Sequence, residues 1–228
     1  MEHGFLWLEV LERPFHLHIP VNVGYFWLAM LILIVAGLIF ARKPSFIPRG
    51  GQNLLEVVIS TLEDFIVENL GEHGRPYVPF LATLFIVILV MNLLGLVPGC
   101  TSATANLNTN AAMAICAVIY AELVGFKVHG LKYIKHYTGP IMAIAPIMIP
   151  IEIISRLARI LSLTFRLFGN IMSKEILLML LFINLDVGKY LLPTLPIYVL
   201  GIFVCLVQAL IFFMLSMIYF QIALEEAH

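Results

Sequence analysis

The sequence is poor in charge and in cysteine. Only 12% of its 228 residues are charged, whereas soluble domains carry about 25%. The net charge of −1 leaves no basic surface of the kind that nucleic-acid binding requires. The sequence has no HExxH motif, internal repeat or low-complexity tract, so we expect no metal and no cofactor. The three cysteines lie far apart without CxxC spacing, which favours ordinary buried thiols: Cys100, Cys116 and Cys205.

Apolar residues are abundant instead. They make up 61% of the chain, and the mean hydropathy is +1.01. Soluble domains contain about 45–50% apolar residues, so one soluble core cannot hold this excess and lipid must solvate much of the chain. We therefore expect an all-α integral membrane protein. The sequence predicts a single membrane domain over residues 1–228 with about five membrane passes.

Long apolar runs mark the spanning helices, each of which needs about 20 residues. After an outer N-terminal segment, 1–20, the predicted spans are 21–41, 77–97 and 107–126. Two clusters of basic residues follow the first and third spans: Arg42, Lys43 and Arg49, then Lys127, Lys132 and Lys135. Because basic loops face the cytoplasm, we expect the N-terminus outside and the C-terminus in the cytoplasm.

Two other stretches differ from these spans. In 52–70, apolar residues at helical spacing are interspersed with acids, which predicts an amphipathic helix lying on the cytoplasmic face of the membrane. The stretch 140–224 is apolar but broken by a polar turn around Asp186. Its two halves both exceed a perpendicular span, so we expect a long, tilted helix hairpin.

Polar residues recur on one face of the first helix of this hairpin. At 100° per residue, they fall within about 40° of the Arg166 direction. They are Glu152, Ser155, Arg159, Ser162, Arg166, Asn170 and Ser173. The stripe is about 30 Å long, close to the thickness of the hydrocarbon core. A polar stripe of that length on an apolar helix needs water or a polar partner along it.

The arginines of this helix predict an ion path. Glu152 and Arg156 are spaced to pair along the helix, and this pairing leaves Arg159 and Arg166 without an obvious acid on the same face. An arginine at mid-membrane costs about 2.5–3.5 kcal/mol on insertion scales, so we expect a partner chain or a water-filled cavity beside it. Arginine stays charged at any working pH. A fixed cation here would block direct proton leakage and lower the pKa of a carboxylate brought beside it.

These residues leave more than one function open. An ion-translocating subunit working against a partner explains the arginines that lack a partner in the same helix. A stand-alone secondary ion transporter is the main alternative, and it would favour internal repeats with interrupted helices at matching positions. An intramembrane metalloprotease would need a zinc-binding motif, which the sequence lacks.

The segment 162–170 reads SLTFRLFGN. It resembles the S-L-x-x-R-L-F-G-N signature of subunit a of rotary F-type ATP synthases. Further similar segments follow in the family's order, at 91–98, 106–110 and 207–209, and the resemblance covers about residues 20–225. It implies a multi-pass stator subunit of the bacterial inner membrane that translocates protons and is not an enzyme on its own. The implied partners are a ring of c subunits, the peripheral-stalk b subunits and the rest of the ATP synthase.

The resemblance also implies residue roles. It makes Arg166 the essential arginine facing the c-ring, between two offset half-channels. Positions associated with the outer half-channel are matched by Asn170, Glu175 and Gln208. Glu152 and Ser155 match positions of the cytoplasmic half-channel.

The geometry of the helix adds detail to the outer route. Glu175 lies nine residues beyond Arg166, about 180° around the helix, so we expect it to face Gln208 on the last helix. Asn170 would then turn the route towards Arg166. The alternative is a patch of Lys174 and Glu175 at head-group level.

Lys174 departs from the family, since many members have a small residue there, and Gly201 stands where some members place an ionisable side chain.

Overall fold

Six long helices make up the part of the chain that the structure describes, and no strand occurs among those residues. The computed structural model describes residues 20–41, 50–97, 100–133, 145–184 and 191–224. The predicted all-α fold is confirmed.

The long helices follow one another with short 3₁₀ turns between some of them. They are α2 (Val21–Ala41), α3 (Gly51–Leu70), α4 (Val78–Leu94), α5 (Leu107–His129), α7 (Ala145–Asn184) and α8 (Leu191–Leu224). The short turns are η1 (Glu72–Tyr77), η2 (Ala103–Ala105) and η3 (Gly130–Tyr133). The predicted span 107–126 thus runs on to residue 129, and the first residues of the predicted hairpin, 140–144, lie outside the described residues.

Local sequence signals explain several helix ends. The Asn106 side chain caps α5 by accepting a hydrogen bond from the Asn108 backbone N–H at 2.9 Å. A proline in the first turn, Pro79, suits the start of α4 because no helical partner is lost there. Helix α3 ends at Gly71 and α5 at Gly130, whose φ angles of 70° and 56° favour glycine.

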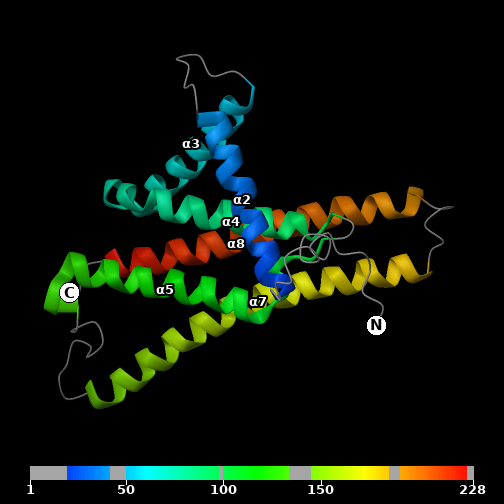
Figure 1. Cartoon of the computed structure of the whole chain (residues 1–228). Helices are drawn as coiled ribbons and strands as arrows, with labels where there is room; N and C mark the ends of the chain where they lie inside the picture. Colours follow the sequence, from blue (N-terminus) through cyan, green and yellow to red (C-terminus); the bar gives the residue numbers. More distant parts are fainter. Residues whose placement is uncertain (1–19, 42–49, 98–99, 134–144, 185–190, 225–228) are drawn as a thin grey trace.

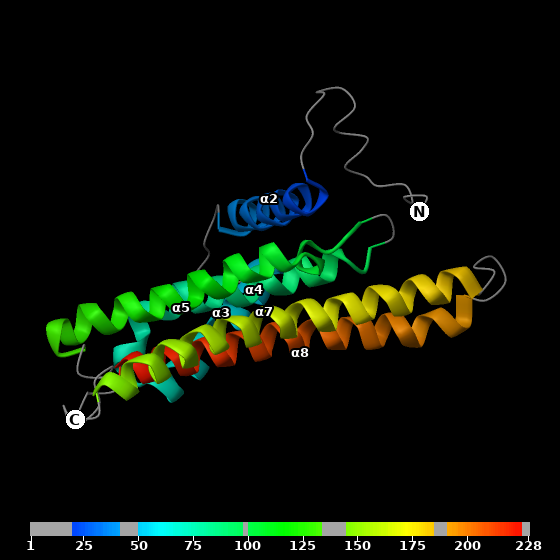
Figure 2. The ribbon, with the colours of Figure 1, turned by 90° about the horizontal axis from the view of Figure 1, so that it is seen from below.

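The helices form layers. Helices α4 and α5 run antiparallel, and α7 and α8 form a second antiparallel pair that packs against them and continues beyond them at one end (Figures 1 and 2). Helix α8 contacts both α4 and α5, and α7 contacts α5. Helix α2 crosses α4 steeply and lies on the side away from α7 and α8 (Figures 1 and 2).

Four segments are long and apolar enough to cross a membrane: Val21–Ile39, Glu72–Leu94, Leu107–His129 and Tyr198–Leu224. The fifth predicted pass is α7. Its 40 residues extend about 60 Å, twice the hydrocarbon thickness, so it fits the bilayer only when strongly tilted. Helix α2 has 21 residues and extends about 31 Å, so it fits upright. With α2 upright, the steep crossing seen in Figure 1 means that the α7–α8 hairpin lies tilted in the bilayer.

The core lies between α4, α5, α7 and α8. Aromatic side chains from α8 fill it, and Phe213 packs against Phe85 of α4 with ring centroids 5.7 Å apart. Helix α3 adds Leu62 and Ile66 to this core and exposes its acids Glu56, Asp64 and Glu68, as an amphipathic helix should. Its place on the cytoplasmic face stays a prediction.

Candidate ion-translocation site

Arg166 lies on the side of α7 that faces away from the core of the helix bundle. Its helical neighbours Leu163 and Leu167 are 1% and 0% exposed and face the core. Arg166 is itself exposed, and its Nη2 lies 3.4 Å from the Ser162 hydroxyl. Among the described side chains it has no ion pair. Other faces of α7 carry apolar side chains that are more than half exposed: Leu157, Leu161 and Phe165. A fixed cation thus projects from the exposed polar stripe of a helix that is otherwise apolar.

One turn further along α7, a polar contact joins the two helices of the hairpin. The Asn170 side-chain amide donates a hydrogen bond to the side-chain carbonyl of Gln208. Gln208 is 1% exposed, whereas Asn170 is exposed. The structure therefore brings together two residues predicted on the outer route. The side chains of Lys174 and Glu175 lie outside the described part, so a contact between Glu175 and Gln208 stays a prediction.

At the other end of the stripe, the predicted pair of Glu152 and Arg156 is confirmed. Arg156 Nη2 lies 3.1 Å from Glu152 Oε1. Arg156 also forms an ion pair with Glu122 of α5, so one guanidinium bridges two helices and two carboxylates. Ser155, the other residue predicted on the cytoplasmic route, is half-buried beside this group.

The second arginine of the stripe has an aromatic partner. The Arg159 guanidinium lies over the Tyr219 ring of α8, 5.5 Å from its centroid. Such a cation–π contact contributes about 0.5–2 kcal/mol, depending on desolvation. Sequence reasoning missed this contact and the bridge to Glu122, because both depend on which helices pack together.

The glycine at position 201 has a packing reason. It is buried in α8, and a Cβ there would lie 2.7 Å from the Leu96 Cδ2 that follows α4. An ionisable side chain would have to displace Leu96. The glycine therefore accompanies a close approach of α8 to the end of α4.

A buried polar cluster holds the connection between α4 and α5. Thr104 donates to the Asn92 side-chain carbonyl at 2.6 Å, and Asn110 donates to the Thr104 backbone carbonyl at 2.7 Å. Ser102 donates to the Met91 carbonyl at 3.0 Å. These hydrogen bonds satisfy polar groups that would be costly to bury alone. Their arrangement fixes the loop, since each joins η2 or its flank to a helix.

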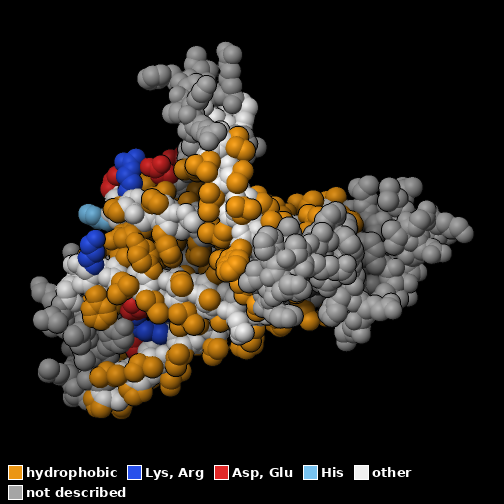
Figure 3. Space-filling model, viewed as in Figure 1, with side chains coloured by type: hydrophobic (Ala, Val, Ile, Leu, Met, Phe, Trp, Pro, Cys, Tyr) orange, Lys and Arg blue, Asp and Glu red, His pale blue; other side chains and the backbone are white. Residues whose placement is uncertain are grey.

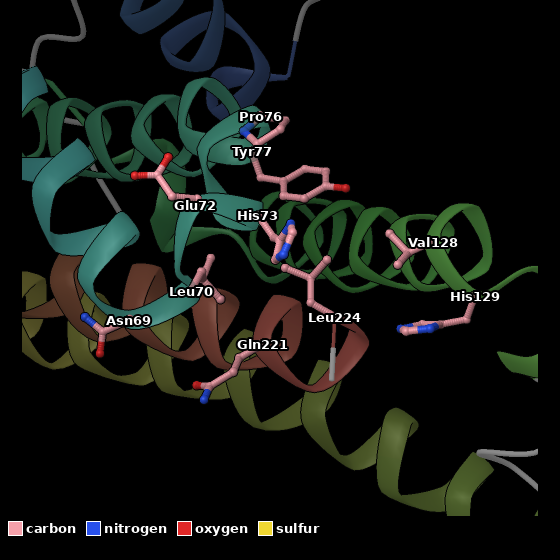
Figure 4. Close-up of a pocket in the computed structure, with 10 residues that line it drawn as sticks. All are labelled: Asn69, Leu70, Glu72, His73, Pro76, Tyr77, Val128, His129, Gln221 and Leu224. Carbon is pink, nitrogen blue, oxygen red and sulfur yellow. The ribbon is translucent and has the colours of Figure 1, made fainter. Parts of the chain in front are cut away.

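An open pocket of about 760 Å³ lies at the opposite end of the helices. It is bounded by the end of α3, η1, and the C-terminal ends of α5 and α8 (Figure 4). Its polar lining includes His73 and His129, with Asn69, Glu72 and Gln221. Figure 3 shows that most of the described surface on this face of the molecule is apolar. Charged side chains gather near the pocket end of the helices and between α5 and the start of α7.

Comparison with known proteins decides the family. A family model described as "ATP synthase A chain" matches residues 23–221. The chain belongs to the ATP synthase subunit a family. It is 47% identical to "ATP synthase subunit a" of Desulfosudis oleivorans, over the full length of both chains. It is 50% identical to "ATP synthase subunit a" of Solidesulfovibrio magneticus, over 97% of this chain and 92% of the other. It is 46% identical to "ATP synthase subunit a 1" of Pelobacter propionicus, over both full lengths.

Membership in the subunit a family confirms the predicted class of function, ion transport in ATP synthesis by a transmembrane subunit. It identifies a bacterial multi-pass membrane protein that is a component of the F-type complex. The stand-alone transporter is not favoured, because the relatives that match this chain over its whole length are subunits of a larger assembly.

Proposed function

We propose that this subunit conducts protons past a ring of c subunits, with Arg166 as the fixed cation between two offset half-channels. The observation that carries this proposal is the exposure of Arg166, without an ion pair among the described side chains, on the polar stripe of an otherwise apolar helix. A lone guanidinium facing lipid would be costly. A ring carboxylate arriving at this face would remove that cost and complete the ion pair.

The two routes follow from the two ends of the polar stripe. On the outer side, Asn170 and Gln208 form the contact nearest to Arg166, and Glu175 belongs to the same route. On the cytoplasmic side, Glu152 and Ser155 line the other route. The two routes are offset along α7, because 14 helical residues, about 21 Å, separate Glu152 from Arg166, and Asn170 lies on the other side of Arg166.

The sequence of proton steps follows from the chemistry of arginine. A proton enters by the outer route and neutralises a ring carboxylate, which then moves into the apolar membrane. After nearly a full turn, the acid reaches the cytoplasmic route and loses its proton. The resulting carboxylate passes Arg166, which favours the ionised form and never gives up its own proton. The membrane potential supplies about 2.3 kcal/mol per charge per 100 mV.

The proposed partners and placement follow the same logic. The exposed face of α7 around Arg166 receives the c-ring, and the peripheral-stalk b subunits hold this subunit against the ring's rotation. It is not an enzyme on its own, since it supplies the ion path and the rest of the complex supplies the ATP chemistry. In the bacterial plasma membrane the N-terminus lies outside and the C-terminus in the cytoplasm.

Replacement of Arg166 tests this proposal. Inverted vesicles containing the Arg166→Ala complex should make no ATP under an imposed proton gradient, because a ring carboxylate would meet no fixed cation. The amount of assembled complex should remain near that of the parent, since the side chain is exposed and lies outside the core. ATP synthesis at the parental rate would remove Arg166 from the mechanism.

A further inference from the structure

Arg156 joins two carboxylates from different helices. It pairs with Glu122 of α5 and with Glu152 of α7. The Arg156 side chain is 11% exposed, and those of Glu122 and Glu152 are 23% and 21% exposed. Figure 3 shows acidic and basic side chains together between α5 and the start of α7, surrounded by apolar side chains. The three groups form a largely buried charge cluster at the inner end of the stripe.

Tyr133 completes the surroundings of Glu122. Its hydroxyl donates to Glu122 Oε2 at 3.1 Å, and the Arg156 guanidinium lies 6.0 Å from the centroid of its ring. The ring is buried against Gly125 of α5, where a Cβ would collide with the ring and its hydroxyl. The absence of a side chain at Gly125 thus allows η3 to bring the hydroxyl to the carboxylate.

The net charge of the cluster allows it to take up one proton. Two carboxylates and one guanidinium carry a net charge of −1, so one added proton makes the group neutral. Arg159 adds a further positive charge one turn along α7, but its guanidinium lies over the Tyr219 ring. A neutral form is favoured in a site of low dielectric constant, where net charge is costly. The group of Glu122, Arg156 and Glu152 can therefore take up a single proton.

Polar groups continue from the cluster towards the open pocket. The His129 ring lies nearly parallel to that of Tyr133, with centroids 6.2 Å apart. His129 lines the pocket, and Figure 4 shows it reaching from α5 towards Leu224 at the end of α8. Its Nε2 is buried and has no hydrogen-bond partner in the part of the chain that the structure describes. The His129 ring thus lies between the open pocket and Tyr133, the residue whose hydroxyl donates a hydrogen bond to Glu122.

We propose that Glu122 is a second proton acceptor of the cytoplasmic half-channel, shared with Glu152 and positioned by Arg156 and Tyr133. This role rests on the proposed function. A ring carboxylic acid releases its proton to water in the passage, and the Glu122 or Glu152 carboxylate binds it and becomes a carboxylic acid. That acid then gives the proton to cytoplasmic water and returns to the carboxylate. Arg156 keeps its own proton throughout.

The test measures passive proton conduction through the membrane part of the whole complex, in inverted vesicles stripped of the soluble ATPase. Rates are normalised to the amount of complex. Glu122→Gln preserves the size of the side chain and its hydrogen bonding but removes the titrating group. We expect it to slow conduction by less than about tenfold, because Glu152 remains. The Glu122→Gln/Glu152→Gln variant should lose about 100-fold, more than the product of the two single losses.

Control variants separate an acceptor from a structural clamp. Glu68→Gln, on the exposed side of α3, should conduct like the parent. Glu122→Asp retains an acceptor and should conduct faster per complex than Glu122→Gln, even if both lower assembly. Tyr133→Phe removes only the hydroxyl and should slow conduction less than Glu122→Gln.

Two results would overturn the role of Glu122. One is equal conduction per complex in the Glu122→Gln and Glu122→Asp variants. The other is a double variant that conducts like Glu152→Gln alone. The Arg166→Ala variant distinguishes this failure from that of the proposed function. If Arg166→Ala loses ATP synthesis while Glu122→Gln conducts normally, only the role of Glu122 fails. If Arg166→Ala still makes ATP at the parental rate, the proposed function fails.

Discussion

The contact between Asn170 and Gln208 makes an asymmetric prediction. Gln208 is 1% exposed, whereas Asn170 is exposed. Asn170→Leu leaves the buried Gln208 amide without this partner, a loss of about 1–3 kcal/mol. Gln208→Leu instead removes the buried group and leaves an exposed Asn170 that water can satisfy. The cost of Gln208→Leu is then only the lost hydrogen bond, which contributes about 0.6–1.7 kcal/mol between membrane helices. Asn170→Leu should therefore lower the amount of assembled complex more than Gln208→Leu does.

The same contact sets the expected loss of proton conduction. A free-energy difference of about 0.6–1.7 kcal/mol changes the population of the hydrogen-bonded arrangement about three- to twentyfold. Each single variant should slow passive conduction per complex by a factor in this range. The double variant should be little worse than the poorer single, because both substitutions break one contact. Asn53→Leu, at an exposed position of α3, is the matched control. Losses that multiply in the double variant, or a single variant that conducts like the parent, would refute the reasoning.

Three further substitutions test other parts of the site. Arg166→Lys should lose most ATP synthesis in inverted vesicles, because an ammonium lacks the planar fork of arginine and can lose its proton when desolvated; synthesis near the parental rate would show that any cation suffices. Glu175→Gln should slow passive conduction with assembly intact, and parental conduction would place Glu175 at the membrane surface instead. Arg156→Leu leaves Glu122 and Glu152 facing each other without their shared cation, at a cost of about 3–5 kcal/mol. It should sharply lower the amount of complex in the membrane, and an unchanged amount would show that the bridge does not stabilise the fold.

Helical periodicity predicted the features that depend on one helix. The stripe from Glu152 to Ser173, the exposed side of Arg166, and the pair of Glu152 and Arg156 all follow from 100° per residue. The same rule predicted the two faces of α3. Apolar length gave the four spans, and the length of the apolar run 140–224 predicted the hairpin of α7 and α8.

Contacts between helices were beyond the reach of periodicity. Glu122 is a single acid near the end of an apolar helix, and nothing local predicts that Arg156, 34 residues later, lies beside it. Periodicity also did not pair Asn170 with Gln208, which the packing of α7 on α8 brings together, and the expected contact between Glu175 and Gln208 stays a prediction. The close approaches at Gly125 and Gly201 likewise depend on which elements pack there. Sequence spacing orders the residues around one helix, but the crossing of two helices selects which of them meet.

The central claim is that Arg166 both completes coupling and separates the two half-channels. One measurement on Arg166→Ala tests both parts, by recording ATP synthesis and passive proton leakage in the same inverted vesicles. The account predicts no ATP synthesis together with leakage faster than in the parent, because no fixed cation remains to block protons between the two routes. ATP synthesis at the parental rate with unchanged leakage would contradict it.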